Sequence, residues 1–371
     1  MAGRLGWMRM VKSSLLRTFG VLALPTVLVG TLVGASTAAA TVGARGAALP
    51  AAVTSLGGAL VGDAAISGQS AWAVGYSNSA STLVVHWNGV SWRQIPSPSP
   101  GSGAQLGGVA VLSARNAWAV GETGTFKTLI LHWNGVAWRQ VASPSSGAFN
   151  LLQHVVALSA SNVWAVGNGG SGLEILHFNG VSWKLVPCPQ PAGAGFFLGI
   201  AATSASNMWA VGYGGGKGLI EHWNGSAWKI VTSPAPTGGS YLYSVAANSA
   251  TNAWAVGYNG TKTLILHWNG AAWKQVASPT PAASSSLQGV AITSNNNVWA
   301  VGSAGSGPSA KSLIVHWNGR SWRQVPSPTP IGGGWLQGVT ALSAGTTWAV
   351  GGGNYHHIFT VRWTGTTWRQ Q

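Results

Sequence analysis

The stretch WAVGYNGTKTLILHWNGAAWKQVASPTP, residues 254–281, contains every part of a unit that recurs along this chain of 371 residues. A block of the type HWNG follows each WAVG, with variants HFNG at 177–180 and RWTG at 362–365, and a further tryptophan stands six residues after the first residue of each block. Twenty of the 22 tryptophans fall in this frame. A repeat this regular decides the architecture before any single element is assigned. The WAVG segments begin 45 to 49 residues apart, at Trp72, Trp118, Trp164, Trp209, Trp254, Trp299 and Trp348.

Each unit is predicted to form four short antiparallel strands. In the third unit they cover residues 154–159, 163–167, 174–178 and 183–187. The Asn-Gly pair between strands three and four is a strong hairpin signal, because such a tight turn needs a positive φ at its centre. The prolines after strand four end the ladder, since they have no N–H to donate. Seven such units predict an all-β fold, a seven-bladed β-propeller with four antiparallel strands per blade. A solenoid would need atypical capping repeats, and the sequence has none.

Composition also predicts which strand of a blade is innermost and which is outermost. Strand one is rich in small residues, as in GVAVLS and GIAATS, which suits crowded inner strands around a narrow axis. Strand four has a cation directly after its tryptophan in every unit, which an outermost strand needs to discourage edge-to-edge pairing. These cations are Arg93, Arg139, Lys184, Lys229, Lys274, Arg323 and Arg369.

The first 40 residues differ from the rest. Basic residues precede an apolar run at 19–34, and three alanines at 38–40 end it, which is the pattern of a secretory signal peptide. An uncleaved membrane anchor is the alternative, since the run is almost long enough to span a bilayer. Pro25 and the small-residue end favour cleavage and a secreted, extracellular protein without stable membrane insertion. The expected organisation is a signal peptide at 1–40, a linker or closing strand at 41–58, and the propeller at 59–371.

Two features bear on how the ring closes and what stabilises it. Residues 47–50 (AALP) align with the strand-four segment RQIP, so this segment is a candidate closing strand. The last unit already ends in WRQQ, which favours closure by side-chain packing between the seventh and first blades. Cys188 is the only cysteine, so packing rather than an intrachain disulfide must stabilise the chain.

Charge restricts the class of partner. Charged residues make up 6% of the chain, whose formal net charge is +15, and the part beginning at Thr41 keeps +11. This charge favours anionic partners. Nucleic acid is not expected, because the chain is predicted to be exported. The aromatic content excludes a disordered chain, and no amphipathic helical runs follow the leader.

The repeat resembles that of secreted bacterial β-propeller proteins with WAVG/HWNG blades, which are grouped loosely with the kelch and galactose-oxidase-like propellers. The resemblance covers residues 60–371 and rests on the WAVG, HWNG and second-tryptophan positions. It implies a propeller fold and export. The kelch double glycine, the Trp-Asp pair of WD40 repeats and the aspartate box of sialidases are absent, so the resemblance implies no particular activity.

The repeated aromatic and histidine residues are predicted to be structural. Equivalent positions in successive blades are separated by whole sheets, so the histidines of the blocks cannot share one metal ion, and no metal or cofactor is expected. Each is instead expected to bond a backbone group at a blade corner, with Arg362 as a donor in the seventh unit. The tryptophans are expected to fill the space between blades, although aromatic faces also bind sugars. The histidines are His86, His132, His177, His222, His267 and His316.

Catalysis has one candidate pair. Glycoside hydrolysis needs two suitably spaced carboxylates, and only Glu174 and Glu221, which replace aliphatic residues of strand three, offer them. Cys188 lies outside any Tyr–Cys cofactor motif, and no serine triad can be assembled from the single aspartate, Asp63. An exported polysaccharide-active enzyme is therefore an alternative, and a non-enzymatic protein is favoured.

Variation between the units is confined to one face. The loop between strands two and three varies from 10 to 14 residues, counted from the glycine of WAVG to the next block, whereas the other spacings are constant. That loop and the connection from strand four to the next strand one share a face of the disc, and loops on a rigid scaffold commonly bind ligands. Lysines and aromatics gather there, which suits an anionic or hydroxyl-rich polymer. The candidate ligand-binding residues are Lys127, Lys217, Lys262, Lys311, His357, Tyr213, Tyr258, Tyr355, Phe196, Tyr241 and Trp335.

The sequence thus favours a monomeric, exported, non-catalytic module. We expect it to bind an anionic or neutral polysaccharide of the cell envelope or extracellular space, or a surface protein, through this variable face. The enzyme and a purely structural surface protein are the two alternatives.

Overall fold

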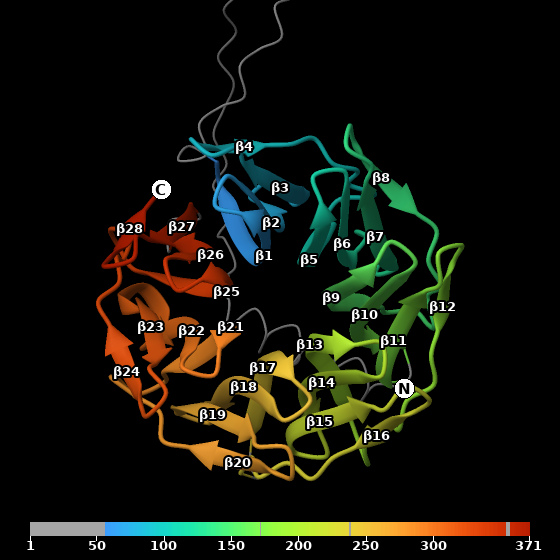
Figure 1. The fold of residues 1–371 in the computed structure, drawn as a ribbon. Helices are drawn as coiled ribbons and strands as arrows, with labels where there is room; N and C mark the ends of the chain where they lie inside the picture. Colours follow the sequence, from blue (N-terminus) through green and yellow to red (C-terminus); the bar gives the residue numbers. More distant parts are fainter. Residues whose placement is uncertain (1–55, 171, 237–238, 354–356) are drawn as a thin grey trace, which may run out of the picture. The chain divides into compact units, whose positions relative to one another are not determined.

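The computed structural model describes residues 56–170, 172–236, 239–353 and 357–371. These residues form seven four-stranded antiparallel sheets arranged radially around a common axis (Figure 1). The predicted fold, an all-β seven-bladed propeller, is confirmed. Within the described residues, no helix is long and apolar enough to cross a membrane. The predicted signal peptide and most of the segment 41–58, including 47–50, lie outside the described residues.

Each blade comes from one continuous stretch of chain, with its strands in sequence order from the axis outward. The innermost strands are β1 (Gly58–Ser67), β5 (Gln105–Ser113), β9 (Leu151–Ser159), β13 (Gly195–Ser204), β17 (Ser240–Ser249), β21 (Ser286–Ser294) and β25 (Gly334–Ser343). The second strands are β2 (Ser70–Ser77), β6 (Asn116–Glu122), β10 (Asn162–Gly169), β14 (Asn207–Gly214), β18 (Asn252–Asn259), β22 (Asn297–Ala304) and β26 (Thr346–Gly353).

The outer two strands of each blade are shorter. The third strands are β3 (Thr82–Trp87), β7 (Thr128–Trp133), β11 (Gly172–Phe178), β15 (Lys217–Trp223), β19 (Lys262–Trp268), β23 (Lys311–Trp317) and β27 (Ile358–Trp363). The outermost strands are β4 (Trp92–Gln94), β8 (Trp138–Val141), β12 (Trp183–Leu185), β16 (Trp228–Ile230), β20 (Trp273–Val276), β24 (Trp322–Val325) and β28 (Trp368–Gln370). A short 3₁₀ helix, η2 (Gly307–Ser309), lies in the longest loop between strands two and three.

Glycines allow the backbones to approach closely near the axis. A Cβ on Gly62 would lie 2.9 Å from the carbonyl oxygen of Gly107 in the next blade. The glycine of WAVG faces a carbonyl of strand one in its own blade. A Cβ on Gly212 would lie well inside 3.0 Å of the Phe196 carbonyl oxygen, and the other six WAVG glycines are equally confined. Close backbone packing therefore requires the small residues of strand one and the glycine of each WAVG segment.

Tryptophans join each blade to the next. The ring of Trp209 in β14 lies 4.9 Å from that of Trp268 and 5.1 Å from that of Trp273, both in the following blade. The same arrangement of three aromatic rings recurs at all seven seams, with Phe178 replacing one tryptophan. The WAVG tryptophans are at most 4% exposed, so they belong to the core. Such aromatic clusters stabilise an interface beyond their buried area alone.

The HWNG turn differs in detail from a two-residue hairpin. In the fifth blade, Trp268 pairs with Trp273, which leaves four residues in the loop. Gly270 has a φ of +92°, whereas the asparagine before it does not have a positive φ. The Asn269 side-chain oxygen instead accepts the N–H groups of Ala271 and Ala272, each at 3.0 Å. The asparagine is therefore required for its side-chain hydrogen bonds, and the glycine for its φ.

Candidate functional site

The histidines of the HWNG blocks are structural, but their partner differs from the expected one. Their ring centroids lie 4.1 to 4.3 Å from those of the WAVG tryptophans of the same blades. The Nε2 atom of His222 hydrogen-bonds the side-chain oxygen of Asn207 at 2.7 Å. The expectation of a backbone partner was therefore wrong: the partner is the side chain that opens strand two, which is asparagine in five blades and Ser70 in the first.

Burial lowers the pKa of all six of these histidines, so each is held as a neutral imidazole. In the seventh blade, the guanidinium carbon of Arg362 lies 4.7 Å from the ring centroid of Trp348 and 6.0 Å from that of Trp87. A cation–π contact therefore replaces the stacked imidazole. Over the described residues, no three histidine, cysteine, aspartate or glutamate side chains gather as a metal site would require.

The two candidate catalytic glutamates do not face each other. Glu174 lies between the second and third blades beside Ser146, and Glu221 lies between the third and fourth blades beside Cys188, so the third sheet separates them. Glu221 is 0% exposed, and neither carboxyl oxygen has a hydrogen-bond partner. Burial raises the pKa of Glu221 to about 8. The pair required for glycoside hydrolysis is not assembled.

The carboxyl groups of the other two acidic residues are also removed from the surface. Gln105 donates to a carboxyl oxygen of Glu122 at 2.6 Å. Both carboxyl oxygens of Asp63 are buried on β1, where other blades have valine or isoleucine, and burial raises the pKa of Asp63 well above its ordinary value. The exposed charged side chains of the described residues are consequently all lysine or arginine. A net positive surface charge of this kind favours anionic partners.

Four of the predicted aromatic residues lie together as one row of stacked rings, here called the aromatic row. Phe196 pairs with Tyr213 across the fourth blade, and Tyr241 pairs with Tyr258 across the fifth. The Tyr213 and Tyr241 ring centroids are 4.6 Å apart at an interplanar angle of 15°, which joins the two blades. The Tyr241 and Tyr258 centroids are 5.3 Å apart at 6°.

Tyr243 completes the aromatic row and was not among the predicted residues. Its ring stacks on that of Tyr258 with a centroid distance of 5.8 Å, and the two side chains are also hydrogen-bonded to each other. The signal was present in the sequence, because residues two apart on a strand point to the same face. Burial and the neighbouring phenols Tyr258 and Tyr213 raise the pKa of Tyr241, so its hydroxyl stays protonated.

The remaining candidates are spread around the variable face, which is formed by the loops between strands two and three and the connections between blades and is called the loop face below. Lys217 opens β15 opposite Gly214, the neighbour of Tyr213, and Lys262 opens β19 opposite Asn259. Lys127 and Lys311 occupy the equivalent places in the second and sixth blades, away from the aromatic row.

The two described candidates of the seventh blade are also separate from the aromatic row. The half-buried Trp335 pairs with Gly352 across that blade, and a Cβ on Gly352 would lie 2.9 Å from its ring. His357 forms an isolated bridge with Gly57. Tyr355 lies outside the described residues.

Comparison with known proteins supports the fold. No protein-family model and no curated protein sequence matches the chain. Among solved structures, the chain is similar to YCF48 bound to a D1 peptide, at 18% identity over 84% of this chain and 93% of that one, with a TM-score of 0.58. It is also similar to the BP39L lectin from Burkholderia pseudomallei, at 15% identity over 85% and 98%, with a TM-score of 0.58.

A third similar structure is the fucose-specific lectin from Aleuria aurantia, at 12% identity over 72% of this chain and 94% of that one, with a TM-score of 0.52. At these identities the similarity establishes the propeller fold alone.

Proposed function

We propose that this protein is an exported, non-catalytic binding module that recognises a polysaccharide of the cell envelope or extracellular space through its loop face. The observation that carries the proposal is the aromatic row, in which five aromatic side chains from the strands of two adjacent blades stack on one another. Export rests on the sequence of residues 1–40, and a mature protein that begins at Thr41 would support it.

The aromatic row offers a particular kind of contact. Its rings stack on one another, so much of their faces is already covered, and a ligand meets mainly ring edges and phenol hydroxyls. Tyr213, Tyr241 and Tyr258 each retain a partly exposed side chain. A phenol hydroxyl both donates and accepts hydrogen bonds, which suits the hydroxyls of a sugar. Lys217 begins the next strand of the same blade, opposite Gly214, so its side chain lies on the other face of the sheet from Tyr213 and adds a positive charge to this rim rather than to the row itself.

The structural neighbours are compatible with binding as the role. Two are described as lectins and one as bound to a peptide, and none is described as an enzyme. Rigid propellers that bind through surface loops need no carboxylate pair, which agrees with the separated and buried positions of Glu174 and Glu221.

A glycan array that includes anionic polymers tests the proposal. Tyr241→Phe removes one hydroxyl from the aromatic row while keeping the stacked ring, and we expect at least a tenfold loss of binding. Tyr76→Phe is the matched control, because Tyr76 occupies the strand-two position of Tyr213 and Tyr258 in the first blade. Its binding should equal that of the wild type.

A blank array with an intact circular dichroism spectrum would contradict the proposal and favour a purely structural surface protein. Binding to a peptide array alone would replace the polysaccharide by a protein partner.

A further inference from the structure

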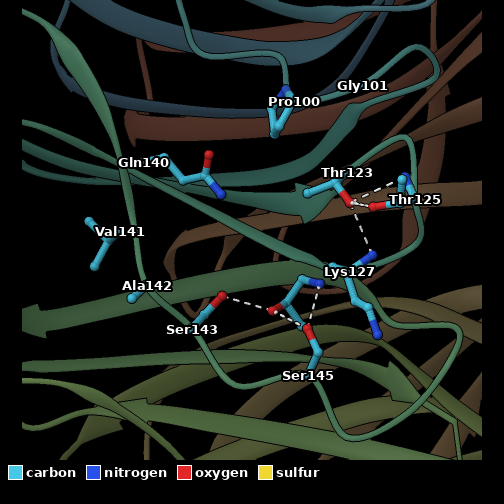
Figure 2. A pocket seen from close by; sticks show the side chains of 11 residues that line it. Pro100, Gly101, Thr123, Thr125, Lys127, Gln140, Val141, Ala142, Ser143 and Ser145 are labelled. Carbon is cyan, nitrogen blue, oxygen red and sulfur yellow. Dashed lines mark hydrogen bonds between the residues drawn. The ribbon is translucent and has the colours of Figure 1, made fainter.

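Two grooves that share most of their lining positions lie at equivalent places in the second and fifth blades. The first has a volume of about 560 Å³ and is lined by Lys127, Thr128, Gln140, Ala142, Ser143 and Ser145 (Figure 2). The second has a volume of about 380 Å³ and is lined by Lys262, Thr263, Gln275, Ala277, Ser278 and Thr280. Both volumes fall within the roughly 300–1,000 Å³ typical of small-molecule sites.

Each groove contains a fixed cluster of three hydroxyl groups. The Thr128 hydroxyl lies 2.7 Å from that of Ser143 and 3.0 Å from that of Ser145. The Ser143 and Ser145 side chains are labelled in Figure 2. The Thr263 hydroxyl lies 2.7 Å from that of Ser278 and 2.8 Å from that of Thr280. The threonine at the centre of each cluster donates its only proton to a backbone carbonyl, Thr128 to Pro144 at 2.9 Å and Thr263 to Pro279 at 2.8 Å, so a ligand would hydrogen-bond the outer hydroxyls.

A lysine stands at the edge of each groove. The Lys127 ammonium group donates to the Gly147 carbonyl at 3.0 Å, which holds it in place and leaves two of its protons for a ligand. Lys262 is exposed. No acidic side chain lines either groove. An anionic group in a groove would therefore meet a cation without meeting a carboxylate.

An alanine leaves room on the floor of each groove. The first and sixth blades repeat the hydroxyl residues but have Pro96 and Pro326 where the grooves have Ala142 and Ala277. Together with the neighbouring Val141, Ala142 offers an apolar patch beside the hydroxyls and the Gln140 amide. A pyranose ring has an apolar C–H face and several hydroxyl groups. It can therefore pack on the apolar patch while it hydrogen-bonds the hydroxyl and amide groups.

We propose that each groove binds one sugar unit bearing a carboxylate or sulfate group, so that the protein holds two such units. This inference rests on the proposed function, since it names the ligand class, but it uses sites other than the aromatic row. A polymer with repeated acidic units could engage both grooves, and the second contact would then be intramolecular.

Isothermal titration with a glucuronate-containing disaccharide tests the inference. We expect two sites, with at least tenfold weaker binding of the neutral glucose disaccharide of the same linkage. Lys127→Gln and Lys262→Gln should each reduce the stoichiometry from two to one, and the double variant should abolish binding. Ala142→Pro, which copies the residue of the first and sixth blades, should fill the first groove and also leave one site.

Controls separate this inference from the proposed function. Lys184→Gln removes an exposed charge on β12, outside both grooves, and should leave two sites. A stoichiometry unchanged by the groove variants would overturn the inference, as would inorganic sulfate binding as tightly as the disaccharide. If Tyr241→Phe loses array binding but the groove variants leave the stoichiometry of disaccharide binding unchanged, only the inference about the grooves is wrong. If the groove results hold and Tyr241→Phe still binds, only the role of the aromatic row is wrong.

Discussion

The ring of Trp348 lies 4.9 Å from that of Trp87, across the junction between the last blade and the first. Trp348 also lies 5.6 Å from Trp92, so this seam repeats the geometry of the internal ones. A bridge between Gly57 and His357 adds backbone pairing beside it. Within the described residues, the ring closes mainly through aromatic packing between complete four-stranded blades.

Removing Trp348 should therefore cost as much stability as removing a tryptophan from an internal seam. Replacing a buried tryptophan by alanine typically costs roughly 3–5 kcal/mol. We expect this loss for Trp348→Ala and for Trp209→Ala alike, measured by urea unfolding followed by far-ultraviolet circular dichroism. Val136→Ala, at an 84% exposed turn residue, should change stability little. A much smaller loss for Trp348→Ala would indicate that another contact closes the ring.

The glycine of WAVG should not tolerate alanine. A Cβ on Gly212 would meet backbone rather than a movable side chain, so the inner strands would have to separate. We expect Gly212→Ala to destabilise by roughly 3 kcal/mol, at the upper end of the range typical of overpacked sites, or to prevent soluble expression. Gly345→Ala is the control, since nothing lies within 4 Å of the Cβ it would add. Equal thermal midpoints for the two variants would contradict the packing argument.

The repeat made the fold predictable, because a period that places tryptophans at fixed strand positions also places them at every seam. The partner of His222 was not predictable from local sequence, since Asn207 lies 15 residues earlier and meets it only when strands two and three pair. The aromatic row requires the contact between Tyr213 and Tyr241 of two different blades. The first groove likewise depends on Gly101, which arrives from the preceding blade.

The histidine–asparagine pairs should contribute to stability without binding metal. His222→Ala removes a hydrogen bond and an aromatic contact with Trp209, and leaves the side-chain oxygen of Asn207 without this partner, while its amide group still donates to Thr203. We expect a loss of roughly 1 kcal/mol, the typical net contribution of one hydrogen bond, because both side chains are only half-buried. Zinc or a chelator should leave the thermal midpoint of the wild type unchanged. A rise of several degrees with zinc, lost in His222→Ala, would show that these imidazoles bind metal.

Glu221 should make stability fall as pH rises. Its carboxyl has an ordinary pKa of 4.5, and burial raises the pKa in the folded protein to about 8. Between these values the unfolded chain releases the proton while the folded protein keeps it, so stability is greatest below pH 4.5 and levels off above pH 8. The pKa difference corresponds to roughly 5 kcal/mol. Glu174 and Asp63, whose pKa values burial also raises, add to the same trend.

Glu221→Leu should remove most of this pH dependence, because Leu131, Leu176 and Leu266 occupy the same position in other blades. The check is urea unfolding at pH 5, 7 and 9. Cys188 provides a second readout, since burial and the neighbouring Glu221 raise its pKa to about 12. In Glu221→Leu, the pKa of Cys188 should fall, and its alkylation by iodoacetamide should therefore begin at lower pH. If both the stability slope and the alkylation profile match those of the wild type, Glu221 is not the buried acid that makes stability depend on pH.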